Sequence, residues 1–252
     1  QGNHDCDFSG NQDIRDTLIE KIQKEGPGAI NVAFIEACTK VQENFFAFRK
    51  RVSPEVQDDD PLWARYKYEI GGYSIAIECP NVAWMSQKKE KQGALVFPVA
   101  NYESLKNESF DLRMVSMHHP LNWYSQSIYR EFRKLVRSVS HVVLTGHEHV
   151  ANSGETLDQE SGHSCFIEAG AISPDEENTI PRLTIIEIDF DAHRYLAEIH
   201  VLREGIFVPL EAASWNSYRP LPEKTNAGIS ITEYFRSKID DPGANFSHPS
   251  KA

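Results

Sequence analysis

Residues 112–149 read LRMVSMHHPLNWYSQSIYREFRKLVRSVSHVVLTGHEH, and this stretch decides the fold class. Leu112–Met117 and His141–Thr145 are short, mostly apolar runs of the length expected for buried strands. Between them, Ser125–Val139 carries apolar residues at helical spacing, which predicts an amphipathic helix. A buried strand, a helix and a second buried strand in succession indicate an α/β fold with neighbouring parallel strands.

Two histidine motifs follow directly after these strands. The first is His118-His119-Pro120, and the second is Gly146-His147-Glu148-His149. Ligands of α/β sheets gather beyond the carboxyl ends of the strands, so the two motifs are expected to meet at one edge. His147 and His149 are two residues apart, and an extended backbone would turn both side chains to one side. Because neutral imidazole binds zinc, iron and manganese well, this pattern predicts a metal site.

A third motif, Gly2-Asn3-His4-Asp5, lies at the start of the chain. The amide oxygen of Asn3 is a neutral ligand that suits harder metals. Asp5 follows His4, and its carboxylate is expected to hydrogen-bond one imidazole nitrogen and so fix the tautomer of the other. The remaining histidines are interpreted as ordinary structural or surface residues: His141, His163, His193, His200 and His248.

The composition narrows the class of protein. The chain has 252 residues, of which 40% are hydrophobic and 25% charged, and these shares are typical of a globular protein. No run approaches the roughly 18 apolar residues that a membrane span needs, so no membrane partner is expected. The net charge of −11 argues against a broad electrostatic grip on nucleic acid. Four scattered cysteines without a CxxC pair favour a reduced, cytoplasmic location.

The rest of the chain is expected to flank this centre. Residues 11–52 predict a helical insert of two helices separated by Gly26-Pro27-Gly28. Its second helix carries Phe45, Phe46 and Phe48, an apolar surface that must pack on the main core or on a partner. We expect one domain over residues 1–213, followed by a linker, a short helix over Ile229–Ile239 and a flexible tail within 214–252.

Alternating patterns predict two hairpins, formed by Trp63–Ile70 with Tyr73–Cys79 and by Arg182–Asp189 with Tyr195–Leu202. Two further short strands are expected at Val82–Met85 and Ser164–Glu168. The segments expected to be loops that shape a substrate pocket are Ser86–Gln92, Asn101–Asn107 and Ser153–Ser161.

The motifs GNHD, HHP and GHEH, in this order, resemble those of the calcineurin-like metallophosphoesterases, and most closely the bacterial branch of cyclic-nucleotide phosphodiesterase-like enzymes. The resemblance covers about residues 2–210. It implies an α/β sandwich of two sheets flanked by helices, with two divalent metal ions (Mn, Fe or Zn) at the strand ends. It also implies that Asn3, His118 and His147 bind one metal and that His149 reaches the other. His4 would act on the leaving group, with Asp5 behind it, whereas the family gives His119 no fixed role.

The sequence departs from the family before GNHD, where the family carries an Asp-x-His and a Gly-Asp motif that supply most ligands of the second metal. The only Asp-x-His here is Asp191-Ala192-His193, far downstream, and no Gly-Asp pair occurs. We expect the chain to be a piece of a longer polypeptide that lacks the N-terminal strands. A separate piece that supplies those ligands and the loss of the second metal are the alternatives.

The leading functional hypothesis is metal-dependent hydrolysis of a phosphoester, more specifically a phosphodiester such as a nucleotide or nucleic acid, by a metal-activated water. A first alternative is a non-catalytic scaffold of the same fold that binds a protein partner. A second is a nuclease component of a larger assembly. In either alternative, the helical insert or the C-terminal segment would hold the partner or a second copy.

Overall fold

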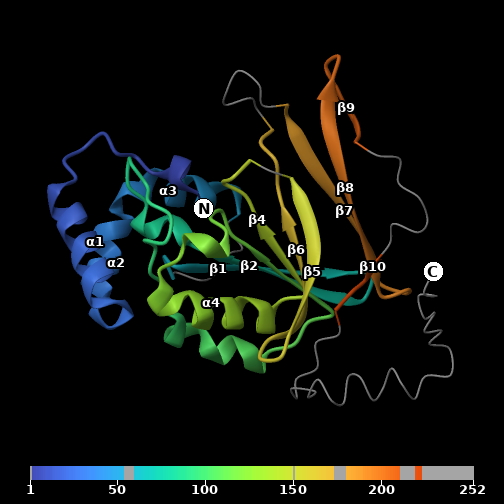
Figure 1. Cartoon of the computed structure of the whole chain (residues 1–252), viewed down its shortest axis with the longest axis horizontal. Coiled ribbons are helices and arrows are strands. Elements are labelled where there is room, and N and C mark those ends of the chain that lie inside the picture. Colours follow the sequence, from blue (N-terminus) through green and yellow to red (C-terminus); the bar gives the residue numbers. More distant parts are fainter. Residues whose placement is uncertain (1, 54–59, 150, 173–179, 211–218, 223–252) are drawn as a thin grey trace, which may run out of the picture.

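The computed structural model describes residues 2–53, 60–149, 151–172, 180–210 and 219–222. These residues form two β-sheets flanked by helices (Figure 1), so the predicted α/β two-sheet architecture is confirmed. The helix expected over Ile229–Ile239 and the tail after it lie outside the described residues.

The larger sheet has six strands in the order β1-β2-β3-β4-β6-β5. Strands β2, β3, β4 and β6 are parallel, while β1 and β5 pair antiparallel with β2 and β6 at the two edges. The parallel centre and its antiparallel edge hairpin at 63–80 agree with the sequence prediction. The strand bounds are β1 Trp63–Ile70, β2 Tyr73–Pro80, β3 Leu112–Ser116, β4 Val142–Thr145, β5 Asn152–Asp158 and β6 Gly162–Glu168.

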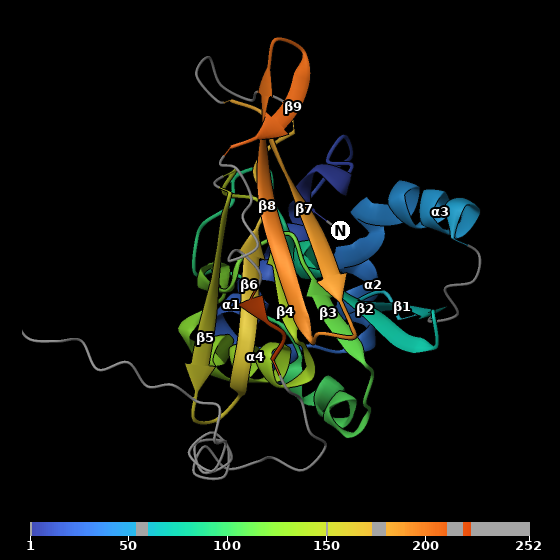
Figure 2. The same cartoon turned by 90° about the vertical axis from the view of Figure 1, so that its right-hand side faces the viewer.

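The smaller sheet covers one face of the larger one, and α4 (Gln126–Val139) covers the other (Figure 2). Alternation along the central strands sorts their side chains accordingly. Val115 and Val143 pack in the core with α4, whereas Val142 and Cys165 pack with Tyr195 of the smaller sheet. The strands of the smaller sheet are β7 Arg182–Asp189, β8 Arg194–Arg203, β9 Ile206–Pro209 and β10 Arg219–Pro220, with β8 pairing to the other three.

The predicted helical insert is present, but its second helix is broken. The helices are α1 Asp13–Glu25, α2 Val32–Thr39 and α3 Glu43–Val52, with the 3-10 turn η3 Lys40–Gln42 between the last two. The break accompanies a buried amide pair: Gln42 and Asn81 each donate an N–H to the other's side-chain oxygen, at 3.1 and 2.7 Å. Ile19, Ile22 and Cys38 join the main core, so α1 and α2 pack on the domain, whereas α3 has no buried residue.

The segment Val82–Met85 is the 3-10 helix η4, so the strand predicted there is wrong. All four side chains are buried, which a short apolar run permits in either conformation. Its carbonyl groups find side-chain donors instead of a neighbouring strand. Arg15 Nη2 donates to the carbonyl of Trp84 at 3.0 Å, and the Cys6 thiol donates to that of Ala83 at 3.8 Å.

Two of the segments expected to be loops form regular secondary structure instead. Ser153–Ser161 contains most of β5, and Asn101–Asn107 belongs to the 3-10 helix η5 Val99–Asn107. β5 is an edge strand that buries little of its surface, so its residues can be polar. It therefore lacks the apolar pattern by which a strand is recognised in the sequence. The remaining short turns are η1 Asn3–Asp5, η2 Pro27–Ala29 and η6 Leu121–Trp123.

A buried charge cluster ties the edge hairpin to the centre of the larger sheet. The Glu78 side chain is fully buried, and its Oε1 accepts from Arg65 Nε and from Arg113 Nε, both at 2.8 Å. Its Oε2 accepts from Trp63 Nε1 at 2.6 Å. Arg113 also donates to the carbonyl of Leu105, which closes this side of the core.

Gly154 in β5 is a position where a side chain does not fit. A Cβ built there would lie 2.6 Å from the Phe166 ring on the paired strand β6. We expect Gly154→Ala to lower the free energy of unfolding by about 1–3 kcal/mol, because the half-buried Phe166 ring, which packs against the core, must shift. Gly28→Ala is the control, since a Cβ there meets no atom within 4 Å. Equal urea midpoints for the two variants would contradict this account.

Candidate metal centre

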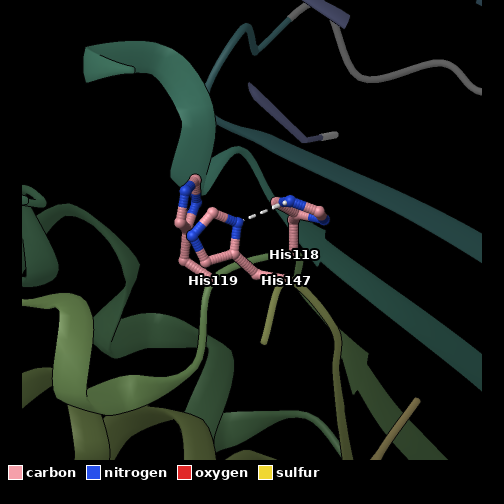
Figure 3. Close-up of side chains that lie close together, drawn as sticks. All are labelled: His118, His119 and His147. Carbon is pink, nitrogen blue, oxygen red and sulfur yellow. Dashed lines mark hydrogen bonds between the residues drawn. The ribbon is translucent and has the colours of Figure 1, made fainter. Parts of the chain in front are cut away.

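His118 and His147 meet at the carboxyl ends of the neighbouring parallel strands β3 and β4. Their nitrogens Nε2 and Nδ1 lie 3.0 Å apart, and the Gly146 amide donates to the His118 carbonyl at 2.9 Å. Figure 3 shows the two rings side by side, with this contact between their nitrogens. The spacing is close to that of two neighbouring ligands on one cation, for bonds of about 2.0–2.1 Å. The predicted convergence of the two motifs is therefore present.

His119 is a third member of the cluster, although the sequence analysis gave it no role. One ring nitrogen of each of His118, His119 and His147 lies within 4.8 Å of the others. The His119 ring is fully buried, with its centroid 4.3 Å from that of His147 (Figure 3). Strand alternation would send adjacent residues to opposite faces, but β3 ends at Ser116, before the motif. The turn therefore brings both histidines to one side.

Glu90 supports this third histidine from the segment between η4 and η5. Its Oε2 lies 3.2 Å from His119 Nε2. Burial raises the pKa of Glu90, but the hydrogen bond from His119, together with the neighbouring Ser86 and the nearby imidazoles, outweighs it and leaves the pKa below its usual range. An ionised carboxylate on the back of an imidazole is the usual outer partner of a metal-bound histidine. The expected loop at 86–92 gave no sequence signal that singled out Glu90.

The environment keeps the paired imidazoles neutral. Burial lowers the pKa of His118 to about 3, and the neighbouring His119 and His147 add to this by charge repulsion. Burial also lowers the pKa of His147, again with a contribution from His119. A neutral ring has a nitrogen lone pair to offer to a cation, so at neutral pH both residues are in the metal-binding form.

The N-terminal turn lies against the same cluster. A Cβ built on Gly2 would lie 2.9 Å from Cγ and Nδ1 of His118, so only glycine fits between the turn and the ring. The next residue, Asn3, has a buried side-chain oxygen that no donor in the described part of the chain reaches. A buried oxygen without a partner is costly, and a cation would satisfy it. The donor set therefore fits a divalent metal ion.

His4 and Asp5 are exposed on this turn. The Asp5 Oδ2 accepts the backbone N–H of Gly2 at 2.8 Å, which caps the turn η1. Among the described residues, this bond replaces the expected hydrogen bond to His4. This cap holds the backbone of Gly2 in place against the His118 ring.

The expectation of an extended backbone at His147 and His149 is wrong. Both residues have left-handed backbone conformations, with φ of 71° and 57°. The alternation of an extended segment therefore does not apply, and His149 is not part of the three-histidine cluster. Glu148 holds this turn in place: its Oε1 accepts from Asn122 Nδ2 and from Trp123 Nε1, each at 3.0 Å.

Trp123 packs on the cluster as well, with its ring centroid 4.2 Å from that of His147. Tyr124 is fully buried and packs against Phe132 of α4. Of the two aromatic residues that follow the HHP motif, Trp123 therefore lines the candidate metal centre, whereas Tyr124 belongs to the core.

No protein-family model matches this chain, and no curated protein sequence matches it. Among solved structures, a hypothetical protein from Thermus thermophilus matches 57% of this chain and 58% of its own, with 15% identity and a TM-score of 0.31. A double mutant of Vps29 from Entamoeba histolytica matches 58% of this chain and 61% of its own, with 17% identity and a TM-score of 0.25. The chain therefore spans about three fifths of the length of these two structures, and such distant likenesses assign neither family nor function.

No helix among the described residues combines the length and the apolar character that crossing a bilayer requires.

Proposed function

We propose that this protein hydrolyses a phosphoester with a water molecule activated by a divalent metal ion. The observation that carries the proposal is the gathering of His118, His119 and His147 at the sheet edge. The N-terminal turn that touches the His118 ring through Gly2 also carries the partnerless oxygen of Asn3. The preference for a phosphodiester, such as a nucleotide or nucleic acid, rests on the resemblance of the three motifs to metallophosphoesterases.

His118, His147 and Asn3 would hold the first ion, with His119 as an additional donor backed by Glu90. Imidazole and amide donors suit manganese, iron or zinc. When bound, such an ion lowers the pKa of water toward neutrality and stabilises negative charge on phosphoryl oxygens. A second ion with His149 among its ligands is also part of the proposal.

The chain's own residues supply position and protons. Glu90 and Glu148 fix the His119 ring and the His147 turn through the hydrogen bonds described above. His4 is exposed on the turn that touches His118, where its imidazolium form would donate a proton to the departing oxygen. A general acid of this kind contributes about 10²- to 10⁴-fold in rate.

The test uses the full chain, stripped of metal and then reloaded with manganese, iron or zinc. Bis(4-nitrophenyl) phosphate and 4-nitrophenyl phosphate serve as generic diester and monoester probes. We expect metal-dependent hydrolysis that is faster with the diester. Loading of metal without hydrolysis of either probe would refute the catalytic proposal.

A binding role without catalysis is the second candidate, and exposed apolar side chains on the insert favour it. Ile14, Val32 and Phe48 are 79, 70 and 58% exposed, on α1, α2 and α3 respectively. Exposed apolar side chains of this kind would be available to a protein partner or to the other components of a nuclease assembly. Elemental analysis separates the candidates, because a scaffold that has lost its chemistry need not retain bound metal.

Glu90→Gln tests the positioning of His119. We expect metal affinity to fall by about 10- to 100-fold. The neutral amide introduced at this position cannot replace the Glu90 carboxylate, which makes the His119 imidazole a better metal ligand. Isothermal titration with manganese or zinc measures the change. Glu103→Gln is the control, since Glu103 is exposed in η5 and forms its ion pair with Lys106, away from the histidines. If the metal affinities of the two variants differ by no more than about twofold, Glu90 does not support the site, because losing an outer partner should cost at least about tenfold.

A further inference from the structure

We propose a second, independent metal site on the hairpin β5–β6, formed by Glu155, His163 and Cys165, which takes a thiophilic divalent cation of the zinc type. One donor atom of each residue lies within 4.8 Å of the other two. The three donors are a carboxylate, an imidazole and a thiol, and each of these is a side-chain ligand that zinc binds in proteins.

The register of the hairpin produces this cluster. Glu155 of β5 pairs directly with Cys165 of β6, and His163 precedes Cys165 by two residues on the same strand. All three side chains therefore stand on one face of the sheet. Cys165 packs with Tyr195 of β8, so this is the face that the smaller sheet covers.

The distances fit a cation after a small adjustment. Four ligands at zinc–ligand bonds of about 2.0–2.3 Å in a tetrahedron stand about 3.3–3.8 Å from one another. Glu155 Oε2 and His163 Nε2 are already 3.3 Å apart, so only the approach to the thiol must shorten, by about 1.3 Å at most. Glu155 is exposed and Cys165 fully buried, which opens the site to solvent on one side only. Water would supply the fourth ligand there.

Tyr195 is suited to support the thiolate. Tyr195 is buried and packs in the same cluster as Cys165. Its phenol O–H would be placed to donate a hydrogen bond to a metal-bound thiolate. Donors of this kind around a ligand tune and hold a metal site.

This cluster is distinct from the candidate metal centre. Cys165 pairs with Val142, the first residue of β4, so the cluster lies toward the amino end of the parallel strands. His147 lies beyond the last residue of the same strand, at the carboxyl end. A cation here would tie the edge strand β5 to β6, beside β8, and would stabilise an edge that is held mainly by backbone pairing.

The test titrates cobalt(II) into the metal-free full chain, because a cobalt–thiolate bond adds a charge-transfer absorption in the near ultraviolet that imidazole and carboxylate do not give. We expect this band in the unaltered chain. His163→Gln and Glu155→Gln should weaken the cobalt affinity read from the band by at least about tenfold, since losing a ligand costs no less than losing an outer partner. Both residues are accessible enough for the fold to persist, which circular dichroism verifies.

Two control variants locate the thiol and separate the sites. Cys6→Ala should keep the band, because Cys6 caps the N-terminal turn η1 and is not a member of the Glu155, His163 and Cys165 cluster. The double variant His118→Ala/His147→Ala should keep it as well, because it alters only the other site. Absence of the band in the unaltered chain, a band unchanged in His163→Gln, or its loss in Cys6→Ala would each overturn the proposal. Cys165→Ser should abolish the band, and if that variant fails to fold, His163→Gln still decides.

Discussion

The double variant His118→Ala/His147→Ala is expected to lose the metal bound at the three-histidine cluster, which lowers its total metal content, and at least about a thousandfold in the rate of phosphodiester hydrolysis. A metal ion supplies several kcal/mol of transition-state stabilisation, and each 1.36 kcal/mol corresponds to about a tenfold change in rate. His118 Nε2 and His147 Nδ1 lie 3.0 Å apart and would be neighbouring ligands of one ion, so removing both rings removes two of its ligands. Elemental analysis and the diester assay measure the two losses.

The fold should survive this double change. Both rings lie beyond the ends of their strands, so their removal leaves the sheet pairing intact. His193→Asn is the matched control, because His193 is exposed in a turn with φ of 48° and asparagine tolerates that conformation. Retention of metal-dependent activity by the double variant, with the control equally active, would rule out this cluster as the catalytic centre.

Glu78→Gln is expected to have the largest effect on stability, a loss of about 3–5 kcal/mol in the free energy of unfolding. The change leaves Arg113 and Arg65 without their shared carboxylate, and the Arg113 side chain is almost fully buried. An uncompensated buried charge is costly because the interior solvates it poorly. Urea unfolding followed by circular dichroism measures the midpoint and the slope.

The control for this prediction removes an exposed partner of the same network. Glu108 pairs with Arg65, but its side chain is 42% exposed. We expect Glu108→Gln to cost no more than about 1 kcal/mol, as for other surface ion pairs. If both variants unfold at the same urea concentration, the stability attributed to the buried carboxylate is wrong.

The sequence pattern predicted the parts of the fold that periodicity controls. The strands before His118 and His147 are short and apolar, and a helix separates them, so their parallel pairing and shared edge could be derived. The hairpins at 63–80 and 182–203 follow from alternation. Val82–Met85 could not be assigned, because an apolar run of four residues fits a buried turn as well as a strand.

The parts of the candidate site that depend on irregular backbone were not predictable. His119 joins the cluster because the chain leaves the strand before it, and His149 departs because the backbone turns left-handed. Glu90 reaches His119 across 29 positions of sequence, a contact that neither motif nor period records. The orphaned oxygen of Asn3 likewise becomes visible only when its surroundings are known.

The bonds that Glu148 makes to Asn122 and Trp123 have a consequence for how the chain meets its ion. They join the turn after β4 to the turn after β3, so the donor nitrogens of the two turns are brought into register while the protein folds. The conformational entropy of assembling those donors is thereby lost during folding and not at the moment of metal capture. Preorganisation of this kind favours a high affinity and a slow release of the bound ion.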